Sequence, residues 1–413
     1  MFRLPLYGIR VLDLTMAWAG PYTTRLLGDM GAEVIKVEAV NSWDLIRTFT
    51  GQPPKVERVW DKSPYFNHLN RDKYGCVLDL SQERGRELFL RLAAISDVVI
   101  ENFRAEVMEN LGLTYEVLSA ANPQLIVVSM PAHGSTGPER DFIAYGTNAE
   151  QLSGLCHLTG YEGGPPQKTG ISYGDPVAGV AAAGAIALAL WDRRRSGRGQ
   201  YIEVAQRENL INLIGEQVVA YSMTGREPAR RGNRHTSMAP HGCYPCSGDD
   251  EWLTLACEDD AQFAALCRVM GRPELAADER FADVVSRYRN QEALDAEIAA
   301  WARERPKETA AALQAAGVPA SPVLSSPGVF EDAHLRARGF FESVAHSVAG
   351  TWEVEGPHWR FSESPGHVRL PAPAFGEHNA YVFRELLGLS EEEVAALEAE
   401  GVTGSAPNWA VHE

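Results

Sequence analysis

The first half of the chain repeats one pattern, in which a short run of β-branched residues is followed by a turn and then by a helical period. These runs predict strands over 9–14, 32–37, 76–80, 97–100 and 125–129. Two of the stretches between them predict helices, one over 20–30 that ends at Gly31 and one over 82–95 that is capped by Ser81. Alternating strands and helices build βαβ units, so we expect a largely parallel sheet covered on both faces.

The pattern changes in the middle of the chain. From about residue 243, short strand signals and Ala-rich helical periods, such as 291–304 and 306–316, predict a second, smaller α/β domain. Near the end, Ser390 and Glu393 form the capping box of a predicted helix. We therefore expect three segments: 1–220 as the first part of a large domain, 221–330 as a small domain, and 331–413 returning to complete the large one.

Composition and charge narrow the possible functions. The length of 413 residues predicts two or three domains, and 45% hydrophobic with 23% charged residues is typical of a globular protein. Lys and Arg number 38 against 55 Asp and Glu, so the net charge of −17 disfavours a general nucleic-acid binder or a membrane-surface binder. A polyanionic ligand would need a local cluster of cations and backbone N–H groups.

The compartment is predicted from cysteines and apolar stretches. Six cysteines spread over this length do not form a disulfide framework, which indicates a reducing compartment, the cytoplasm. We expect no secretory signal at residues 1–6. The longest apolar stretch, 177–191, is shorter than the ~18–20 residues that a membrane-spanning helix requires.

Several familiar motifs are absent or lie in the wrong context. No G-x-G-x-x-G follows the first strand and no P-loop is present, so a nicotinamide cofactor is not expected. Cys243 and Cys246 have redox spacing without a following helix signal, which favours structural cysteines over a redox or metal role. Residues 170–174 match G-x-S-x-G, but the Gly- and Pro-rich residues 163–170 before them exclude the required strand. A serine hydrolase stays an outside alternative.

Asp175 is the most informative acidic residue. It stands between Gly174 and Pro176, directly before the apolar stretch 177–190. Asp is favoured at a helix N-cap and Pro at the first helical position, so we expect Asp175 at the mouth of a buried helix. There the helix N-terminus would favour the ionised carboxylate and keep it available as a nucleophile. From the local sequence alone, an ordinary capping aspartate is the commoner interpretation.

Short motifs in a fixed order along nearly the whole chain resolve this ambiguity. They occupy residues 6–15, 19–22, 31–38, 70–73, 78–80, 101–104, 136–138, 158–160, 174–175, 197–200 and 373–378. Together they resemble the class III CoA-transferases, the CaiB/BaiF type that includes formyl-CoA transferase. The resemblance implies a Rossmann-like large domain built from both chain ends and a homodimer of two interlocked subunits.

The resemblance also implies a reaction and a set of binding residues. Asp175 would be the nucleophile that accepts the acyl group of an acyl-CoA as a mixed anhydride and then forms an aspartyl-CoA thioester, without metal or redox cofactor. A small carboxylic acid would be the acceptor of CoA. The implied CoA contacts are Met16, Ala17, Trp18, Ala19, Asn70, Lys73, Asn102 and Phe103, with Arg71 and Arg104 as nearby cations for the phosphates.

Departures from the family pattern concern the substrate. Trp18 stands where formyl-CoA transferase-like members have Gln, and Tyr145 is followed by Gly146 rather than by an acidic residue. Their Gly-rich loop has no equivalent around 256–261. We expect Trp18 and Tyr145 to contact the substrate, with the indole favouring a bulkier or partly apolar acid over formate or oxalate. Core packing of Trp18 beneath the loop is the alternative.

Two other functions fit the same fold. An α-methylacyl-CoA racemase would place its Asp at Asp175 and its His at Tyr145, where a phenol with a pKa near 10 is a poor base. His133 is the residue best placed to restore that activity. A non-catalytic subunit that only binds CoA is the remaining alternative.

Overall fold

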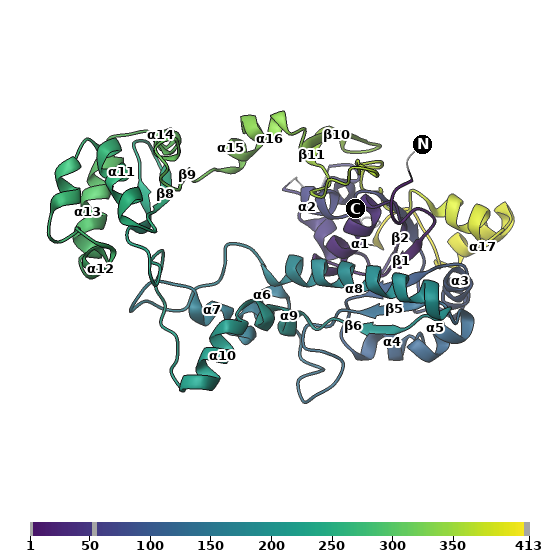
Figure 1. Ribbon diagram of the computed structural model, residues 1–413. Coiled ribbons are helices and arrows are strands. Elements are labelled where there is room, and N and C mark those ends of the chain that lie inside the picture. The colour runs from purple at the N-terminus through teal and green to yellow at the C-terminus, as the bar shows by residue number, and fades with distance from the viewer. Residues whose placement is uncertain (1–2, 52–55, 409–413) are drawn as a thin grey trace. The chain divides into compact units, whose positions relative to one another are not determined.

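The computed structural model describes residues 3–51 and 56–408 (Figure 1). Met1 and Phe2, at the start of the segment searched for a secretory signal, lie outside the described residues. The chain divides into two compact units, so the larger is built from both chain ends and the smaller from the middle. The larger unit comprises Met1–Cys156, Lys168–Arg226 and Ala337–Glu413, and the smaller comprises His157–Gln167 and Glu227–Arg336.

The larger unit is built on a six-stranded sheet with the order β3-β2-β1-β4-β5-β6, in which every pair is parallel. The strands are β1 (Arg10–Asp13), β2 (Glu33–Glu38), β3 (Lys73–Val77), β4 (Val98–Glu101), β5 (Ile126–Ser129) and β6 (Tyr201–Glu203). This is the strand order of the Rossmann fold, and ligands of such sheets bind where the order reverses, here between β1 and β4.

Two strands differ from the sequence prediction. Strand β3 begins at Lys73, three residues before the predicted run. The charged Lys73 can lie within the sheet because its buried ammonium is paired with Asp13. Strand β6 was not predicted, since its three residues at the sheet edge are too few to show a period. The other predicted strands are confirmed to within two residues.

Helices cover both faces of the sheet and form two apolar cores. One core packs α1 (Ala19–Asp29) and α8 (Gly174–Ser196) on the sheet, and the other packs α3 (Glu83–Ala94), α5 (Tyr115–Ala121) and α17 (Glu391–Ala399) on it. The capping box of Ser390 and Glu393 is present at the start of α17, as predicted. Further α-helices before residue 227 are α2 (Pro64–Leu69), α4 (Glu106–Asn110), α6 (Gly146–Ser153), α7 (Leu155–Leu158), α9 (Gln206–Leu213) and α10 (Gly215–Thr224), and the returning segment adds a π-helix over Tyr381–Leu386.

Helix α8 meets the length and composition expected of a membrane-spanning helix, although the apolar stretch 177–191 alone is too short. Half of the residues in its most apolar 18-residue segment are buried. Its Ala- and Gly-rich surface allows close packing against α1, where Gly179 faces the Ala19 carbonyl oxygen. We therefore describe α8 as a core helix, since core helices can have the same length and apolar composition.

The returning segment closes the open edge of β3. It contributes the antiparallel hairpin of β10 (Phe341–His346) and β11 (Gly350–Glu355) and then runs beside β3. His378 Nδ1 accepts the Gly75 N–H and Asn379 Oδ1 accepts the Val77 N–H, at 3.1 and 2.8 Å. Side chains thus satisfy backbone donors that an edge strand would otherwise expose.

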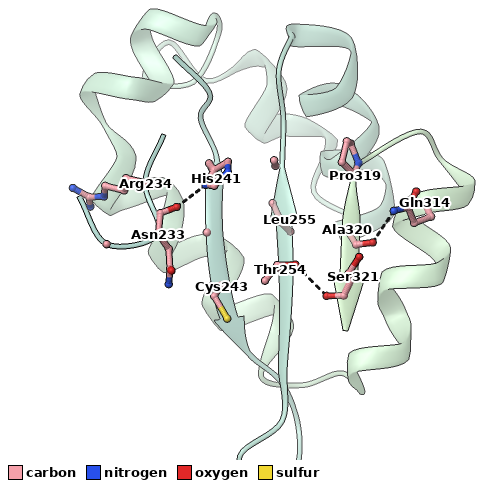
Figure 2. Close-up of a pocket in the computed structure, with 13 residues that line it drawn as sticks. Asn233, Arg234, His241, Cys243, Thr254, Leu255, Gln314, Pro319, Ala320 and Ser321 are labelled. Atoms are coloured by element: carbon pink, nitrogen blue, oxygen red, sulfur yellow. Dashed lines mark hydrogen bonds between the residues drawn. The ribbon is translucent and has the colours of Figure 1, made fainter. Parts of the chain in front are cut away.

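The smaller unit has its own core and an antiparallel sheet with the order β7-β8-β9. Its elements are β7 (His241–Pro245), β8 (Trp252–Ala256), β9 (Ala320–Pro322), α11 (Asp260–Met270), α12 (Val284–Arg289), α13 (Gln291–Ala302), α14 (Ala310–Ala315), α15 (Ser326–Glu331) and α16 (Ala333–Ala337). Figure 2 shows a pocket of about 480 Å³ on the face that bears Cys243, Thr254 and Ser321. Cys243 and Cys246 are free thiols.

Candidate active site

Asp175 lies in the first turn of α8, which begins at Gly174 with Tyr173 as its N-cap. The prediction of Asp175 as the N-cap and Pro176 as the first helical residue is therefore wrong by two positions. The proline is tolerated because the first four N–H groups of a helix have no partner within it. Since Asp175 does not cap its own helix, its carboxylate is free to accept a hydrogen bond from the Ala19 N–H.

Burial controls the proton affinity of Asp175. The residue is only 8% exposed, and loss of water raises the pKa of its carboxyl to about 7. The hydrogen bond from Ala19 lowers this pKa, and the nearby Glu150 carboxylate raises it. The prediction that the helix N-terminus would favour ionisation is therefore wrong in its net effect, because burial outweighs it. Asp175 is mostly ionised only above about pH 7.

A glycine on α6 allows the Asp175 carboxylate to occupy its position. A Cβ atom added to Gly146 would overlap Asp175 Oδ2 and lie 3.1 Å from Oδ1. The residue that departs from the family pattern is thus in direct contact with the predicted nucleophile. Tyr145 precedes it as the N-cap of α6 and is 64% exposed, so its ring is accessible to a ligand.

Aromatic rings lie beside the carboxylate. Trp18 and Tyr65 meet edge to face with ring centroids 5.7 Å apart, and Phe49 lies 6.2 Å from Tyr65. Burial and then the Asp175 charge raise the pKa of Tyr65 to about 12. Trp18 also packs against the buried cluster beneath its loop, so both interpretations of its role agree with its placement. Sequence analysis missed Tyr65 and Phe49, because neither belongs to a motif with a chemical role.

The loop that follows β1 is held from two sides. Asn102 clamps Met16, since its Oδ1 accepts the Met16 N–H and its Nδ2 donates to the Met16 carbonyl oxygen, both at 2.8 Å. Asp44 Oδ1 accepts the Ala17 N–H at 3.0 Å, while Lys36 pairs with the other Asp44 oxygen. Ala17 has a φ of 64°, a strained conformation that such contacts must maintain. The oxygen and the nitrogen of the Asn102 side-chain amide thus both hold the loop.

Lys73 and Asn70, both predicted to contact CoA, are fully buried. Lys73 Nζ donates to Asp13 Oδ2 and the Pro21 carbonyl oxygen at 3.0 Å and to Asn70 Oδ1 at 2.8 Å. All three ammonium protons are therefore used within the protein. Through its bond to Pro21, Lys73 fixes α1, whose first residue is Ala19.

The two arginines predicted to meet phosphates differ in accessibility. Arg71 is 1% exposed and forms a two-pronged pair with Asp29, with N–O distances of 3.0 and 2.9 Å, and it also pairs with Glu355. Its guanidinium is therefore not available to a phosphate here. Arg104 is exposed, and among the described residues its guanidinium forms an ion pair with Glu106 alone, at 3.2 Å. Of the two, Arg104 alone can meet an anion without breaking a buried pair.

A groove of about 430 Å³ opens at the carboxyl ends of β1–β4. Its lining includes Met16 after β1, Ala39 and Ser42 after β2, Leu80 after β3 and Phe103 after β4. This is the position at which Rossmann-type sheets bind their ligands. The loop from Met16 to Ala19 runs from this groove, which Met16 lines, to the Asp175 carboxylate, which accepts the Ala19 N–H.

His133 belongs to a different cluster. Its ring meets Phe142 edge to face at 6.2 Å, and its pKa is lowered by burial and by Arg207 and raised by Glu139. Among the described residues, none of its contacts is with Asp175. The part of the chain that the structure describes contains no group of three or more His, Cys, Asp and Glu residues that could hold a metal ion.

Known proteins resemble this chain over almost its whole length. A sequence model of CoA-transferase family III matches residues 6–379. The succinyl-CoA–D-citramalate CoA-transferase of Chloroflexus aurantiacus is 37% identical over 402 residues, which is 96% of this chain and 98% of that protein. The succinate–glutarate CoA-transferase of Agrobacterium fabrum is 34% identical over 389 residues, covering 92% and 96% of the two chains.

A solved structure also resembles the fold of this chain. The crystal structure of a CaiB/BaiF family protein from Brucella suis superposes with a TM-score of 0.84 at 35% identity, covering 93% of this chain and 100% of that one. The sequence and the fold of this chain therefore both match the same family. The protein belongs to CoA-transferase family III and is an enzyme that transfers CoA.

Proposed function

We propose that this enzyme transfers CoA from succinyl-CoA to a second dicarboxylic acid, with Asp175 as the nucleophile. The observation that carries the proposal is the buried Asp175 carboxylate, which lies between the Ala19 N–H and Gly146 at the end of the loop that lines the groove. The relatives named for citramalate, malate and glutarate support this choice, since each acceptor is a dicarboxylic acid.

The proposed reaction has four balanced steps. An Asp175 oxygen attacks the thioester carbonyl of succinyl-CoA, and the carbon–sulfur bond breaks to give a mixed anhydride and CoA thiolate. The thiolate attacks the Asp175 Cγ of this anhydride, which releases succinate and leaves an aspartyl-CoA thioester. The acceptor carboxylate then displaces the thiolate from Cγ to form a second anhydride. Attack by the thiolate on the acceptor carbonyl releases the new thioester and restores the Asp175 carboxylate.

The surroundings of Asp175 suit these steps. Each attack at Cγ develops negative charge on a carboxyl oxygen, and the Ala19 N–H already points at this carboxylate. A pKa near 7 makes the ionised form more basic than an ordinary aspartate and hence a better nucleophile. Trp18, Tyr65 and Tyr145 would border the acyl group.

The groove at the strand ends would receive the nucleotide end of CoA. Met16 and Phe103 offer an apolar lining, while Arg104 stands at the surface next to Phe103 and can meet a phosphate. This placement leaves the flexible arm of CoA to follow the loop from Met16 toward Asp175. The proposal retains Met16, Ala17, Trp18, Ala19, Phe103 and Arg104 as ligand contacts.

A second copy of the chain is the proposed partner. Helices α8 and α10 carry exposed apolar side chains at Val180, Leu188, Trp191, Val219 and Met223, which are 45–80% exposed in the single chain. Large apolar side chains exposed to this extent are the kind of surface that a partner covers. A homodimer would cover them, in agreement with the interlocked assembly that the family resemblance implies.

The test is an exchange assay followed by trapping. Purified enzyme is incubated with succinyl-CoA and, separately, malate, citramalate, mesaconate and glutarate, and new thioesters are measured by mass spectrometry. We expect at least one dicarboxylyl-CoA, and hydroxylamine should mark Asp175 in wild type but not in Asp175→Asn. Absence of exchange with every acid, or label at Ser172 instead, would overturn the proposal. Deuterium uptake at the α-carbon without exchange would indicate a racemase.

A further inference from the structure

A buried glutamate lies on the same face of α6 as Gly146. Glu150 follows Gly146 by four residues, and residues with this spacing are neighbours on a helix surface. That face packs against the start of α8, where Gly146 touches the Asp175 carboxylate. Glu150 is fully buried, and it stood in none of the motifs that point to the family.

Among the described residues, Glu150 is a buried carboxylate without a paired cation, as are Asp79 and Glu101, whereas most other buried carboxylates have one. Asp13, Asp44 and Asp61 are each paired with a buried Lys or Arg at 3.0 Å. Within residues 3–51 and 56–408, no Lys, Arg or His forms such a pair with Glu150. Burying a carboxylate without a counter-ion is costly, so its retention at this place calls for a specific role.

The two oxygens of Glu150 hold the segment that leads into α8. Oε1 accepts the backbone N–H of Tyr173, the N-cap of α8, and Oε2 lies 3.0 Å from the Thr169 hydroxyl. Tyr173 is two residues before Asp175. The side chain thus connects α6 to the turn that sets the direction of the Asp175 carboxylate.

The charge of Glu150 also acts on Asp175. A second negative charge nearby disfavours the ionised Asp175, whereas an acylated Asp175 carries no charge and escapes the repulsion. The other polar groups that face Asp175 are the Ala19 N–H and the Tyr65 phenol, which stays neutral at physiological pH. Among the described residues, the Glu150 charge also acts on the Cys156 thiol, which Lys168 influences as well.

We infer that Glu150 is a positioning residue, which orients the turn that carries Asp175 and whose negative charge favours the acylated over the free carboxylate form of the nucleophile. The role of Glu150 rests on the proposed function, because it requires that Asp175 carries the acyl group. The resting carboxylate is destabilised relative to the covalent intermediates, two anhydrides and one thioester, which lowers the barrier to forming them.

The test replaces the charge while keeping the shape. In Glu150→Gln the amide oxygen can still accept a hydrogen bond from the Tyr173 N–H, so we expect a Tm within about 2 °C of wild type. The acidic limb of the pH profile of kcat/KM should move down by about 0.5–1 pH unit. A less basic nucleophile should then lower kcat roughly two- to threefold. Glu392→Gln, which removes an exposed carboxylate on α17, is the matched control and should match wild type.

A second variant separates charge from position. Glu150→Asp keeps the charge and shortens the side chain, so its acidic limb should stay where it is in wild type while kcat falls on the order of tenfold. This comparison also applies if Glu150→Gln folds poorly. The role of Glu150 would be overturned if Glu150→Gln had the same kcat and the same acidic limb of the kcat/KM profile as wild type. It would also be overturned if that acidic limb were shifted in Glu150→Asp. Wild type without CoA exchange, or full activity in Asp175→Asn, would instead overturn the proposed function.

Discussion

The replacement Gly146→Ala tests whether the position of the Asp175 carboxylate matters. Gly146 is the first residue of α6 and does not have a positive φ, so alanine fits the backbone. The obstacle is space, because the new Cβ would overlap Asp175 Oδ2 and approach Oδ1 to 3.1 Å. The carboxylate would have to turn away by about 1 Å or more and lose its alignment with the Ala19 N–H.

The expected magnitudes separate activity from stability. Overpacking costs about 1–3 kcal/mol of unfolding free energy, and the higher helix propensity of alanine returns about 1 kcal/mol. The net loss of stability is therefore about 0–2 kcal/mol. A misplacement of about 1 Å costs on the order of 100-fold in rate, equivalent to about 2.7 kcal/mol of activation free energy. We expect a folded enzyme with very low activity.

The assay compares kcat for CoA exchange and hydroxylamine trapping at Asp175 with urea unfolding of the same samples. Gly215→Ala is the matched control, because Gly215 is the first residue of α10 and an added Cβ there meets nothing within 4 Å. This control should keep its activity. A Gly146→Ala enzyme with kcat within about threefold of wild type would refute the reasoning, since a nucleophile so displaced should not react at that rate.

Three further predictions concern pH, stability and binding. The value of kcat/KM should rise as the pH rises through about 7 and level off above it, because the pKa of Asp175 is raised to about 7 and only its ionised form attacks; a flat profile from pH 5 to 9 would contradict this. His68, Arg25 and Arg71 hold the pKa of Glu355 at about 2. Glu355→Gln should therefore lower the free energy of unfolding in urea by about 3 kcal/mol above pH 4.5. This difference from wild type should vanish as the pH falls through 2. Asn102→Ala should raise the KM for succinyl-CoA about tenfold with little change in Tm, because the Met16 clamp is lost; an unchanged KM would show that the loop is held without it.

The sequence by itself determined the architecture of the large unit. Runs of β-branched residues have a period that depends only on neighbours along the chain, so β1, β2, β4 and β5 were predicted to within two residues. The family motifs, read in order, likewise identified Asp175 and the loop after the first strand. Local patterns failed where an element is short, as in β6, or where a polar start is compensated by a distant partner, as in β3.

Only the tertiary structure decided which groups surround Asp175 and in what state. Gly146 and Glu150 reach it through the packing of α6 against α8, and Tyr65, which is 110 residues away in the sequence, comes within range of its charge. The pairing of Lys73 with Asp13, 60 residues before it, and the burial of both side chains could likewise not be predicted from the sequence. Charge interactions and desolvation act through space, over distances that chain spacing does not encode, and they set the pKa of the Asp175 carboxyl near 7 rather than near 4.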